Sequence, residues 1–463
     1  MGKRICLVLL VFCLLLSACD SVVQPGPAPT LEASAPEETP PEALPTPDEP
    51  AQPEPPQREK DWIEDIEFLR EQYRERHLSP FYFRPEEEFD GKLDLLAAKV
   101  GKLTDNEIYF ELSAVVIGMG DLHTRVLVPD SLYERIFPFD IRYFGDRLYL
   151  IGYLEGYEEL APYLLREIVA VNGVDIAYLQ RKAESVLLPT NIWYSKEQFS
   201  YVFGLMAGFY DWAAGLDAQE TYTFQFLNEN QQVESVEVPV VSEEAYRGAE
   251  WVYPAELNTV PVLFKGDSAV YEDRSGECVY LALGSMLSPR EETYRELFEK
   301  AAKLAQEHPD CRKLAIDLRG NPGGYGKAVT YIRKHLHILK ELPFEQIYVL
   351  TNGYTASAAT ECLTLFKKEL DAVTVGEPTG QFTSFFMFST GMSPVTFTLP
   401  HSQLSVQVST GWLEGDNPEN TVLNKMHRLY EWENTILPDV YVYQDIEDIR
   451  QGKDSVLEWV LAQ

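Results

Sequence analysis

Apolar residues recur at helical spacing in two stretches of the chain. Between residues 62 and 73, and again between 93 and 103, large apolar side chains return every three or four positions. This period places them on one face of an α-helix. Pro80 breaks the first pattern shortly after His77. The pattern therefore predicts a helical N-terminal subdomain over residues 58–118, which ends at a polar break that begins with Gly120.

The apolar runs between residues 119 and 275 are shorter and lack helical spacing. Runs at 147–151, 168–171 and 221–226 are rich in aromatic and β-branched residues, which is typical of strands. The second run leads into Asn172-Gly173, so a strand, a turn and a following helix are the favoured interpretation here. Residues 119–275 are accordingly predicted to form a β-rich middle region.

From residue 276 onward, short apolar runs alternate with amphipathic stretches. This alternation predicts βαβ units and a mostly parallel sheet in a core domain over residues 276–445. The expected strands lie at 278–283, 314–318, 347–350 and 372–375, with helices at 289–308, 325–339 and 356–369. Two further runs, at 395–399 and 404–408, predict a hairpin, and residues 446–463 predict a C-terminal helix. The fold class expected is α/β combined with α+β.

The first residues read as a lipoprotein signal. Lys3 and Arg4 precede an apolar run that is too short to cross a membrane comfortably, and Leu16-Ser17-Ala18-Cys19 resembles the bacterial lipobox. Residues 1–18 are thus expected to be removed and Cys19 to be acylated. Residues 19–57 are rich in Pro, Ala and Glu and poor in large apolar side chains, so they are expected to form a disordered tether. We expect an extracytoplasmic protein anchored to the bacterial cell membrane by lipid.

Charge and cysteine spacing exclude several classes of partner. The formal net charge of −34 argues against binding of nucleic acid or of an anionic lipid surface. No cysteine or histidine pair has metal-binding spacing, so neither a metal nor another cofactor is expected. Cys278 and Cys311 each precede a predicted strand; if those strands pair in parallel, the two form either a disulfide or two separate thiols, and both remain open.

Ser357 is the strongest candidate nucleophile. It follows the strand at 347–350 across a turn at Asn352-Gly353 and opens a helix. A serine at such a turn is exposed to substrate, and a nearby glycine-rich loop can offer backbone N–H groups to a developing oxyanion. The loop Arg319–Gly324, which follows the strand at 314–318, supplies such glycines.

These two segments, in this order, resemble the tail-specific (C-terminal processing) serine peptidases. The matching motifs run from Asp317 to Gly324 and from Asn352 to Ala358, and the resemblance covers roughly residues 60–445. It implies a ClpP/crotonase-like protease core, a PDZ-like remnant around Leu165–Val174, and cleavage of peptides or proteins through a serine ester. It also implies an oxyanion hole made by the N–H of Ala358 with that of Gly323 or Gly324.

The resemblance further suggests a histidine as the general base. Many members of the family place a lysine after the segment that begins Gly376-Glu377, but here Gln381 stands there, and a glutamine cannot accept a proton. The tricorn-like branch uses a histidine instead. Gly120–Thr124 resembles its Asp-Gly-His-Thr signature, with Leu122 in the place of the glycine, so His123 is the expected base.

An acidic residue should orient the imidazole. By resemblance to the tricorn branch, Glu433 is the first candidate, and Asp416 and Glu414 remain alternatives. Three other functions stay open: a catalytically degenerate protein that binds peptides on the same fold, a Ser–Lys peptidase, and an esterase. The esterase is disfavoured because no Gly-x-Ser-x-Gly surrounds Ser357.

Overall fold

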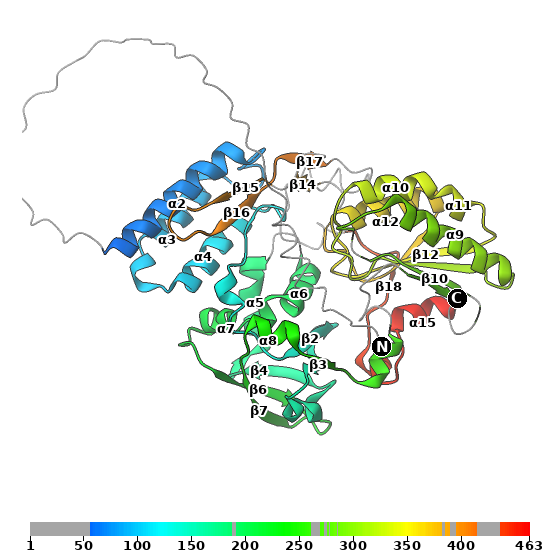
Figure 1. Ribbon diagram of the computed structural model, residues 1–463, viewed down its shortest axis with the longest axis horizontal. Helices are drawn as coiled ribbons and strands as arrows, with labels where there is room; N and C mark the ends of the chain where they lie inside the picture. The colour runs from blue at the N-terminus through cyan, green and yellow to red at the C-terminus, as the bar shows by residue number, and fades with distance from the viewer. Residues whose placement is uncertain are drawn as a thin grey trace, which may run out of the picture.

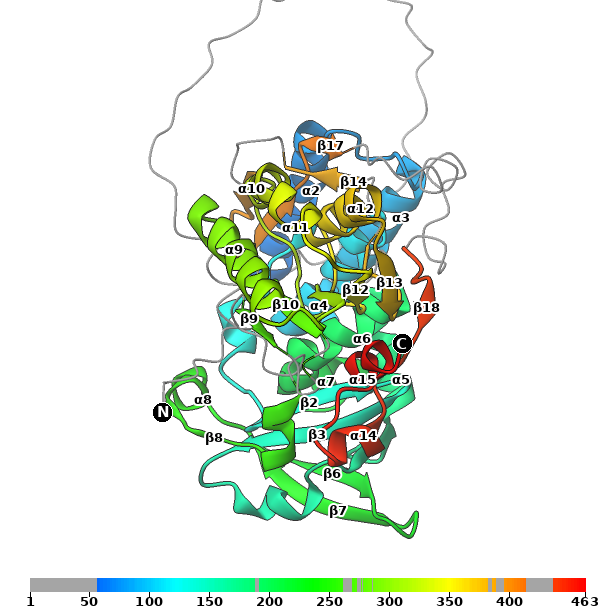
Figure 2. The ribbon, with the colours of Figure 1, turned by 90° about the vertical axis from the view of Figure 1, so that its right-hand side faces the viewer.

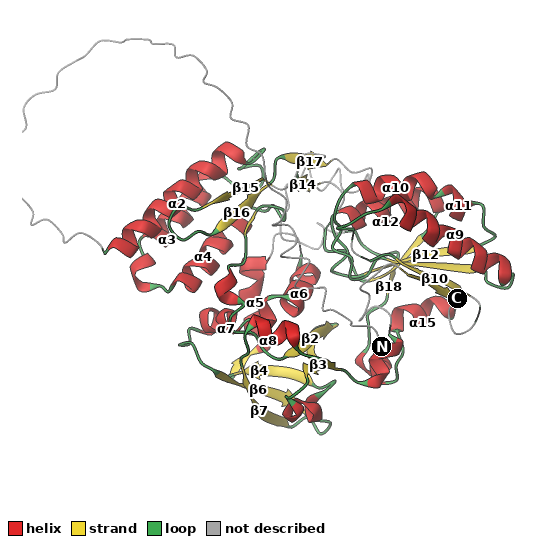
Figure 3. Cartoon of the chain, in the orientation of Figure 1, coloured by secondary structure: helices red, strands yellow, loops and turns green. Residues whose placement is uncertain are grey.

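Three lobes make up the protein (Figure 1). The structure is a computed structural model, and it describes residues 56–187, 191–260, 269–272, 276, 278–284, 286–381, 385–388, 395–413 and 436–463. The three lobes are named here by their main elements. The helical lobe is built on α2 to α4, the sheet lobe on β2 to β7, and the core lobe on β9 to β13 with α9 to α12. Figure 3 shows that helices predominate in the helical lobe, beside the strands β15 and β16, and that the other two lobes combine helices with strands. No helix in these ranges is both long and apolar enough to span a bilayer.

The helical lobe confirms the first predicted region. Its helices are α2 (Gln57–Arg76), α3 (Glu86–Ala97) and α4 (Asp105–Ile117). Thr104 begins α4 through a capping box with Glu107, in which each side chain accepts a hydrogen bond from the other residue's backbone N–H. Ile66 and Leu69, on the predicted apolar face of α2, are fully buried.

The hairpin at the C-terminal side of the sequence lies on the helical lobe rather than in the core lobe. β15 (Val395–Thr398) and β16 (Ser405–Val408) pair antiparallel as predicted, and β16 also pairs with β1 (Arg125–Val126). Phe397 and Val406 share one hydrophobic core with α2 to α4. The predicted region 276–445 is therefore divided in space, because its apolar hairpin face is buried against the helices.

The sheet lobe contains more helix than the sequence pattern predicts. Its strands are β2 (Phe139–Phe144), β3 (Arg147–Leu154), β4 (Glu167–Val171), β5 (Val174–Asp175), β6 (Thr221–Leu227), β7 (Val233–Pro239) and β8 (Trp251–Val252). Its helices are α5 (Ile176–Leu187), α6 (Ile192–Tyr201), α7 (Ala207–Ala214) and α8 (Glu243–Gly248). The turn at Asn172-Gly173 is confirmed, with φ of 48° and 77° at the two residues. α5 and α7 pack on α4, so one continuous core joins this lobe to the helical lobe.

The core lobe has the predicted mostly parallel sheet, in the order β18-β13-β12-β11-β10-β9. Its strands are β9 (Ala269–Glu272), β10 (Cys278–Ala282), β11 (Lys313–Asp317), β12 (Gln346–Thr351), β13 (Val373–Gly376) and β18 (Val440–Tyr441), and β9 alone among these runs antiparallel to its neighbour. Its helices are α9 (Glu291–Glu307), α10 (Lys327–His335), α11 (His337–Lys340) and α12 (Ala358–Leu370). A separate ribbon pairs β14 (Phe385–Met387) with β17 (Gly411–Leu413). Short 3-10 helices occur at Val100–Lys102, Asp130–Leu132, Glu158–Tyr163, Phe203–Leu205 and Ala255–Thr259.

Alternate residues of the parallel strands are buried on opposite faces of this sheet. Val279 and Leu281 of β10 pack against α9 to α12, whereas Tyr280 packs on the other face beneath the C-terminal segment. The single helix predicted at 446–463 is wrong, because the structure has two: α14 (Ile446–Arg450) and α15 (Ser455–Leu461). α14 packs against the sheet lobe and α15 against the core sheet, so this segment bridges two lobes (Figure 2).

The two thiols that precede β10 and β11 do not form a disulfide. Cys278 and Cys311 are both buried thiols outside any disulfide, and the Cys311 thiol donates a hydrogen bond to the carbonyl of Gly276. The strands pair in parallel as expected, but Cys278 lies beside Lys313 in the register. Of the two open alternatives, the separate thiols are confirmed.

Candidate active site

The turn between β12 and α12 holds Ser357 in a sparsely populated backbone conformation. Its φ of 52° and ψ of −126° lie outside the regions favoured by residues with a side chain. The Asn352 Oδ1 accepts hydrogen bonds from the N–H groups of Gly320 and Tyr354 (2.9 and 3.2 Å), which ties this turn to the glycine-rich loop. Strain of this kind persists where the surroundings enforce it, and such positions cluster at functional sites.

The structure brings His123 to Ser357 from a distant part of the sequence. The Nε2 atom of His123 lies 3.4 Å from the Oγ of Ser357. The imidazole stacks on Phe385 of β14, with ring centroids 5.4 Å apart. Hydrogen bonds between a nucleophile and its base are often long in free enzymes and shorten around substrate, so this geometry suits proton transfer.

The other ring nitrogen of His123, Nδ1, is the atom that an orienting carboxylate would contact. Nδ1 is buried near the backbone of Phe386 and makes no hydrogen bond of good geometry with a described residue. The acid candidates Glu433, Asp416 and Glu414 all lie outside the described residues. Burial lowers the pKa of His123, and the charge of Arg125 acts in the same direction, while Asp121 and the backbone of Phe386 partly oppose them.

Two backbone amides near Ser357 are candidates for an oxyanion hole. The N–H of Gly323 donates to the Oδ1 of Asn321 (2.9 Å), so the prediction of Gly323 as a possible donor does not fit this geometry. The described part of the chain provides no acceptor for the amides of Gly324 and Ala358. Gly323 instead allows close packing: a Cβ there would lie 2.7 Å from the Cβ of Ser357.

Gln381, which stands where the family lysine is expected, contacts the nucleophile's backbone. Its side-chain Oε1 accepts a hydrogen bond from the N–H of Ser357 (2.9 Å), and the residue is only 2% exposed. This contact stabilises the unusual φ of Ser357. The sequence showed that Gln381 is no base, but gave no signal for this role. Lys367, in the last turn of α12, forms an ion pair with Asp439 (2.6 Å).

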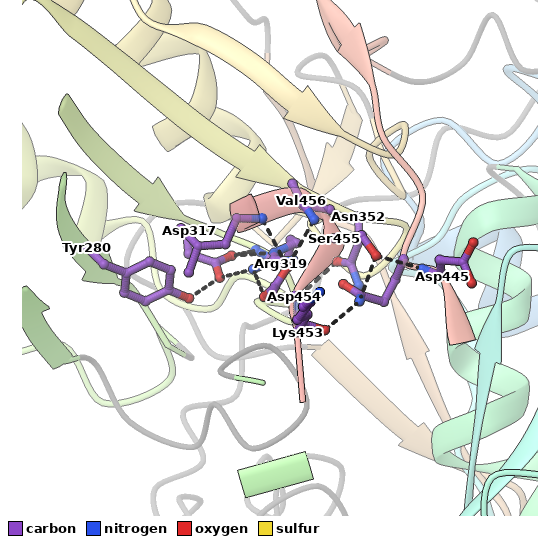
Figure 4. A network of polar contacts seen from close by, with 12 residues as sticks. Tyr280, Asp317, Arg319, Asn352, Asp445, Lys453, Asp454, Ser455 and Val456 are labelled. Atoms are coloured by element: carbon purple, nitrogen blue, oxygen red, sulfur yellow. Dashed lines mark hydrogen bonds and ion pairs between the residues drawn. The ribbon is translucent and has the colours of Figure 1, made fainter. Parts of the chain in front are cut away.

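A buried ion-pair network anchors the glycine-rich loop (Figure 4). The guanidinium of Arg319 forms ion pairs with Asp317 (2.8 Å) and with Asp454 (2.7 Å), which lies just before α15. Tyr280 also donates a hydrogen bond to Asp317. All three charged side chains are at most 3% exposed. Burial acts to lower the pKa of Arg319, but the two carboxylates outweigh it and hold this pKa well above its ordinary value. Nothing in the local sequence marks Asp454 as an ion-pair partner of Arg319, so this contact was not predicted.

The sheet lobe also contacts the turn that precedes Ser357. Glu197 of α6 accepts a hydrogen bond from the Nδ2 of Asn352 (2.8 Å). Burial and the neighbouring Glu377 raise the pKa of Glu197 to about 8, and burial raises that of Glu377 to about 7. Asn352 thus links α6, the glycine-rich loop and the turn that carries Ser357.

Comparison with solved structures shows that the chain shares the fold of mature CPAF. No protein-family model matches the sequence. The crystal structure of mature CPAF is similar with a TM-score of 0.55, at 12% identity over 87% of this chain and 96% of that chain. The structure of mature CPAF complexed with lactacystin is similar with a TM-score of 0.56, again at 12% identity, over 87% of this chain and 97% of that chain. The photosystem II D1 C-terminal processing protease has a TM-score of 0.38, at 13% identity over 85% of this chain and 94% of that chain.

Proposed function

We propose that the protein is a serine-type peptidase of the tail-specific kind, which cleaves peptides or proteins by acyl transfer through Ser357. The observation that carries this proposal is the approach of Nε2 of His123 to Oγ of Ser357, at 3.4 Å, across a strained strand-to-helix turn. A serine hydroxyl needs an adjacent base to become nucleophilic, and neutral imidazole supplies one. Gln381 accepts from the Ser357 amide and has no basic atom, which disfavours a Ser–Lys pair.

The proposed reaction follows from these positions. Ser357 Oγ attacks the scissile carbonyl while Nε2 of His123 takes the hydroxyl proton. The N–H groups of Gly324 and Ala358 stabilise the oxyanion that forms. His123 then gives its proton to the departing amine, and water attacks the serine ester with His123 again as base. We assign the carboxylate at Nδ1 of His123 to Glu433, with Asp416 and Glu414 as alternatives.

A serine-directed probe tests the proposal. A fluorophosphonate should label the wild-type protein and leave Ser357→Ala unlabelled, because the probe forms a covalent bond with an activated serine oxygen. Membranes that carry the wild type, but not those that carry Ser357→Ala, should release fragments from labelled peptides. A wild type that is folded and remains unlabelled would favour the peptide-binding, catalytically degenerate alternative. Ester turnover without peptide turnover would favour an esterase.

We further propose that the protein acts outside the cytoplasm, attached to the membrane by lipid on Cys19. The support is the segment Leu16–Cys19 and the Pro- and Glu-rich stretch that follows it. Cys19→Ala should abolish incorporation of labelled fatty acid and block maturation at this site, whereas Cys278→Ala, at a buried thiol, should not. Unchanged acyl labelling of Cys19→Ala would contradict the anchor.

A further inference from the structure

We propose that Asp121, itself fixed by His77, is a positioning residue that holds His123 in place beside Ser357. The inference rests on the proposed function, since it concerns the base of that reaction. Asp121 is 4% exposed and His77 is 5% exposed, so their polar atoms face each other away from solvent. Nothing in the proposed reaction uses either side chain directly.

Asp121 holds the loop that carries His123 by its backbone. Its Oδ1 accepts a hydrogen bond from the N–H of His123 (2.9 Å). Its Oδ2 accepts one from the hydroxyl of Thr124 (2.6 Å) and lies 3.1 Å from Nε2 of His77. A single carboxylate thus closes a tight turn around the base, as an Asx turn does. Rotation of the Asp121 side chain would release the N–H of His123 and the hydroxyl of Thr124.

The proton of His77 is placed by a neighbouring amide. The N–H of Ser79 donates to Nδ1 of His77 (3.0 Å), so Nδ1 carries no proton and Nε2–H points at Asp121. The ring is held between Tyr73, stacked with centroids 5.3 Å apart, and Phe386, at 5.0 Å edge to face. His77 is the C-cap residue of α2, so the end of this helix supports the loop that carries His123.

A second segment closes the frame. The N–H of Ser409 donates to the hydroxyl oxygen of Thr124 (2.9 Å), and the carbonyl of Ser409 accepts from the N–H of Leu78 (2.9 Å). The side chain of Gln407, on β16, donates to the carbonyl of His123 (2.9 Å). The base is therefore held through its N–H by Asp121 and through its carbonyl by Gln407.

Charge adds to the effect of position. Burial would raise the pKa of Asp121, but the hydrogen bond from His77 and the electrostatic interactions with His77 and His123 outweigh it, so this pKa is lowered. The carboxylate is consequently charged at neutral pH. Burial, the largest effect, lowers the pKa of His123, and the charge of Arg125 lowers it further. The charge of Asp121 and the backbone of Phe386 raise this pKa, but by less. Asp121 thus partly offsets the effect of burial on the pKa of the imidazole.

The test compares Asp121→Asn with two variants of His77. In Asp121→Asn the new amide Nδ2 meets the Nε2–H of His77, two donors in contact, and the negative charge is lost. The rate of fluorophosphonate labelling should fall about 10- to 100-fold, the loss known for removal of a group that orients a metal-bound histidine. His77→Gln keeps a donor near the position of Nε2 and should stay within about threefold of wild type. His77→Phe keeps the stacking, loses the donor, and should behave like Asp121→Asn.

A second measurement separates this role from a merely structural one. The imidazole of His123 is titrated by NMR in the Ser357→Ala protein, with and without Asp121→Asn, so the readout needs no activity. The pKa of His123 should be lower without the carboxylate, and nitrogen shifts in the otherwise unaltered protein should show the proton of His77 on Nε2.

Each outcome bears on one claim. Labelling of Asp121→Asn at the wild-type rate, an unchanged His123 titration, or a His77 proton on Nδ1 would overturn the positioning role while the serine peptidase stands. Equal loss in His77→Gln and His77→Phe would also count against it. A wild type that the probe does not label, with His123 still sensitive to Asp121, would overturn the proposed function alone.

Discussion

Replacing His123 by alanine should reduce kcat by about 10⁴-fold or more, because loss of the base removes the group that activates the nucleophile. The residual labelling of Ser357 by a fluorophosphonate should fall in parallel. Steady-state hydrolysis of a labelled peptide checks the expectation. Lys367→Ala is the matched control. Lys367 lies in the last turn of α12 and forms an ion pair with Asp439, so this variant should retain most activity.

The pH profile gives the same prediction a second readout. If neutral His123 is the base, kcat/KM should rise with pH and level off above the pKa of this imidazole in the free enzyme. Burial lowers that pKa from its ordinary value of 6.5, so the rising limb should lie on the acid side of 6.5. Full activity in His123→Ala, or loss of activity only when a lysine is removed, would contradict the assignment.

Local sequence patterns were sufficient for the elements that carry Ser357. β12 and α12 begin and end within two residues of their predicted bounds, because the strand is continuously apolar and its helix is amphipathic. The turn between them was also predictable, since Asn352-Gly353 favours one. The parallel sheet followed from the alternation of such strands and helices.

Contacts between distant segments were beyond the reach of these patterns. The approach of His123 to Ser357 was expected only through the family resemblance, and no periodicity in the sequence specifies it. Asp454 pairs with Arg319 across 135 positions of the sequence. The sequence contains many other carboxylates, and no local pattern distinguishes Asp454 from them as the partner of Arg319. The hairpin at 395–408 was predicted as a hairpin, but its place on the helical lobe depends on which apolar face covers it.

Helices α6 and α7 show a different reason for failure, whereas α5 is the helix that was predicted to follow the Asn172-Gly173 turn. They follow α5 in succession, between β5 and β6, in a region whose most evident signals were strand runs. α7 has mostly apolar residues on all sides, so its periodicity is weak. Such a segment is helical because it is buried between α4 and the sheet lobe. Tertiary burial therefore decided its structure, and short apolar runs do not distinguish a buried helix from a strand.

Arg319→Met should destabilise the protein by about 3–5 kcal/mol, the range measured when one partner of a buried ion pair is removed. Methionine fills much of the space, but it leaves Asp317 and Asp454 buried together without a cation. Chemical denaturation followed by circular dichroism gives the change in the free energy of unfolding. The loop Gly320–Gly324 also loses its anchor, so labelling of Ser357 should slow at temperatures where the variant remains folded.

Arg312→Met is the matched control for this substitution. Arg312 pairs with Glu345 at 3.4 Å, but both side chains are more than half exposed, so the pair should contribute little to stability. The double variant Asp317→Asn with Arg319→Met should recover part of the loss, because it leaves one fewer unpaired charge in the interior. Equal stability of Arg319→Met and Arg312→Met would mean that water or another cation reaches the two carboxylates. The network would then be no buried anchor for the loop.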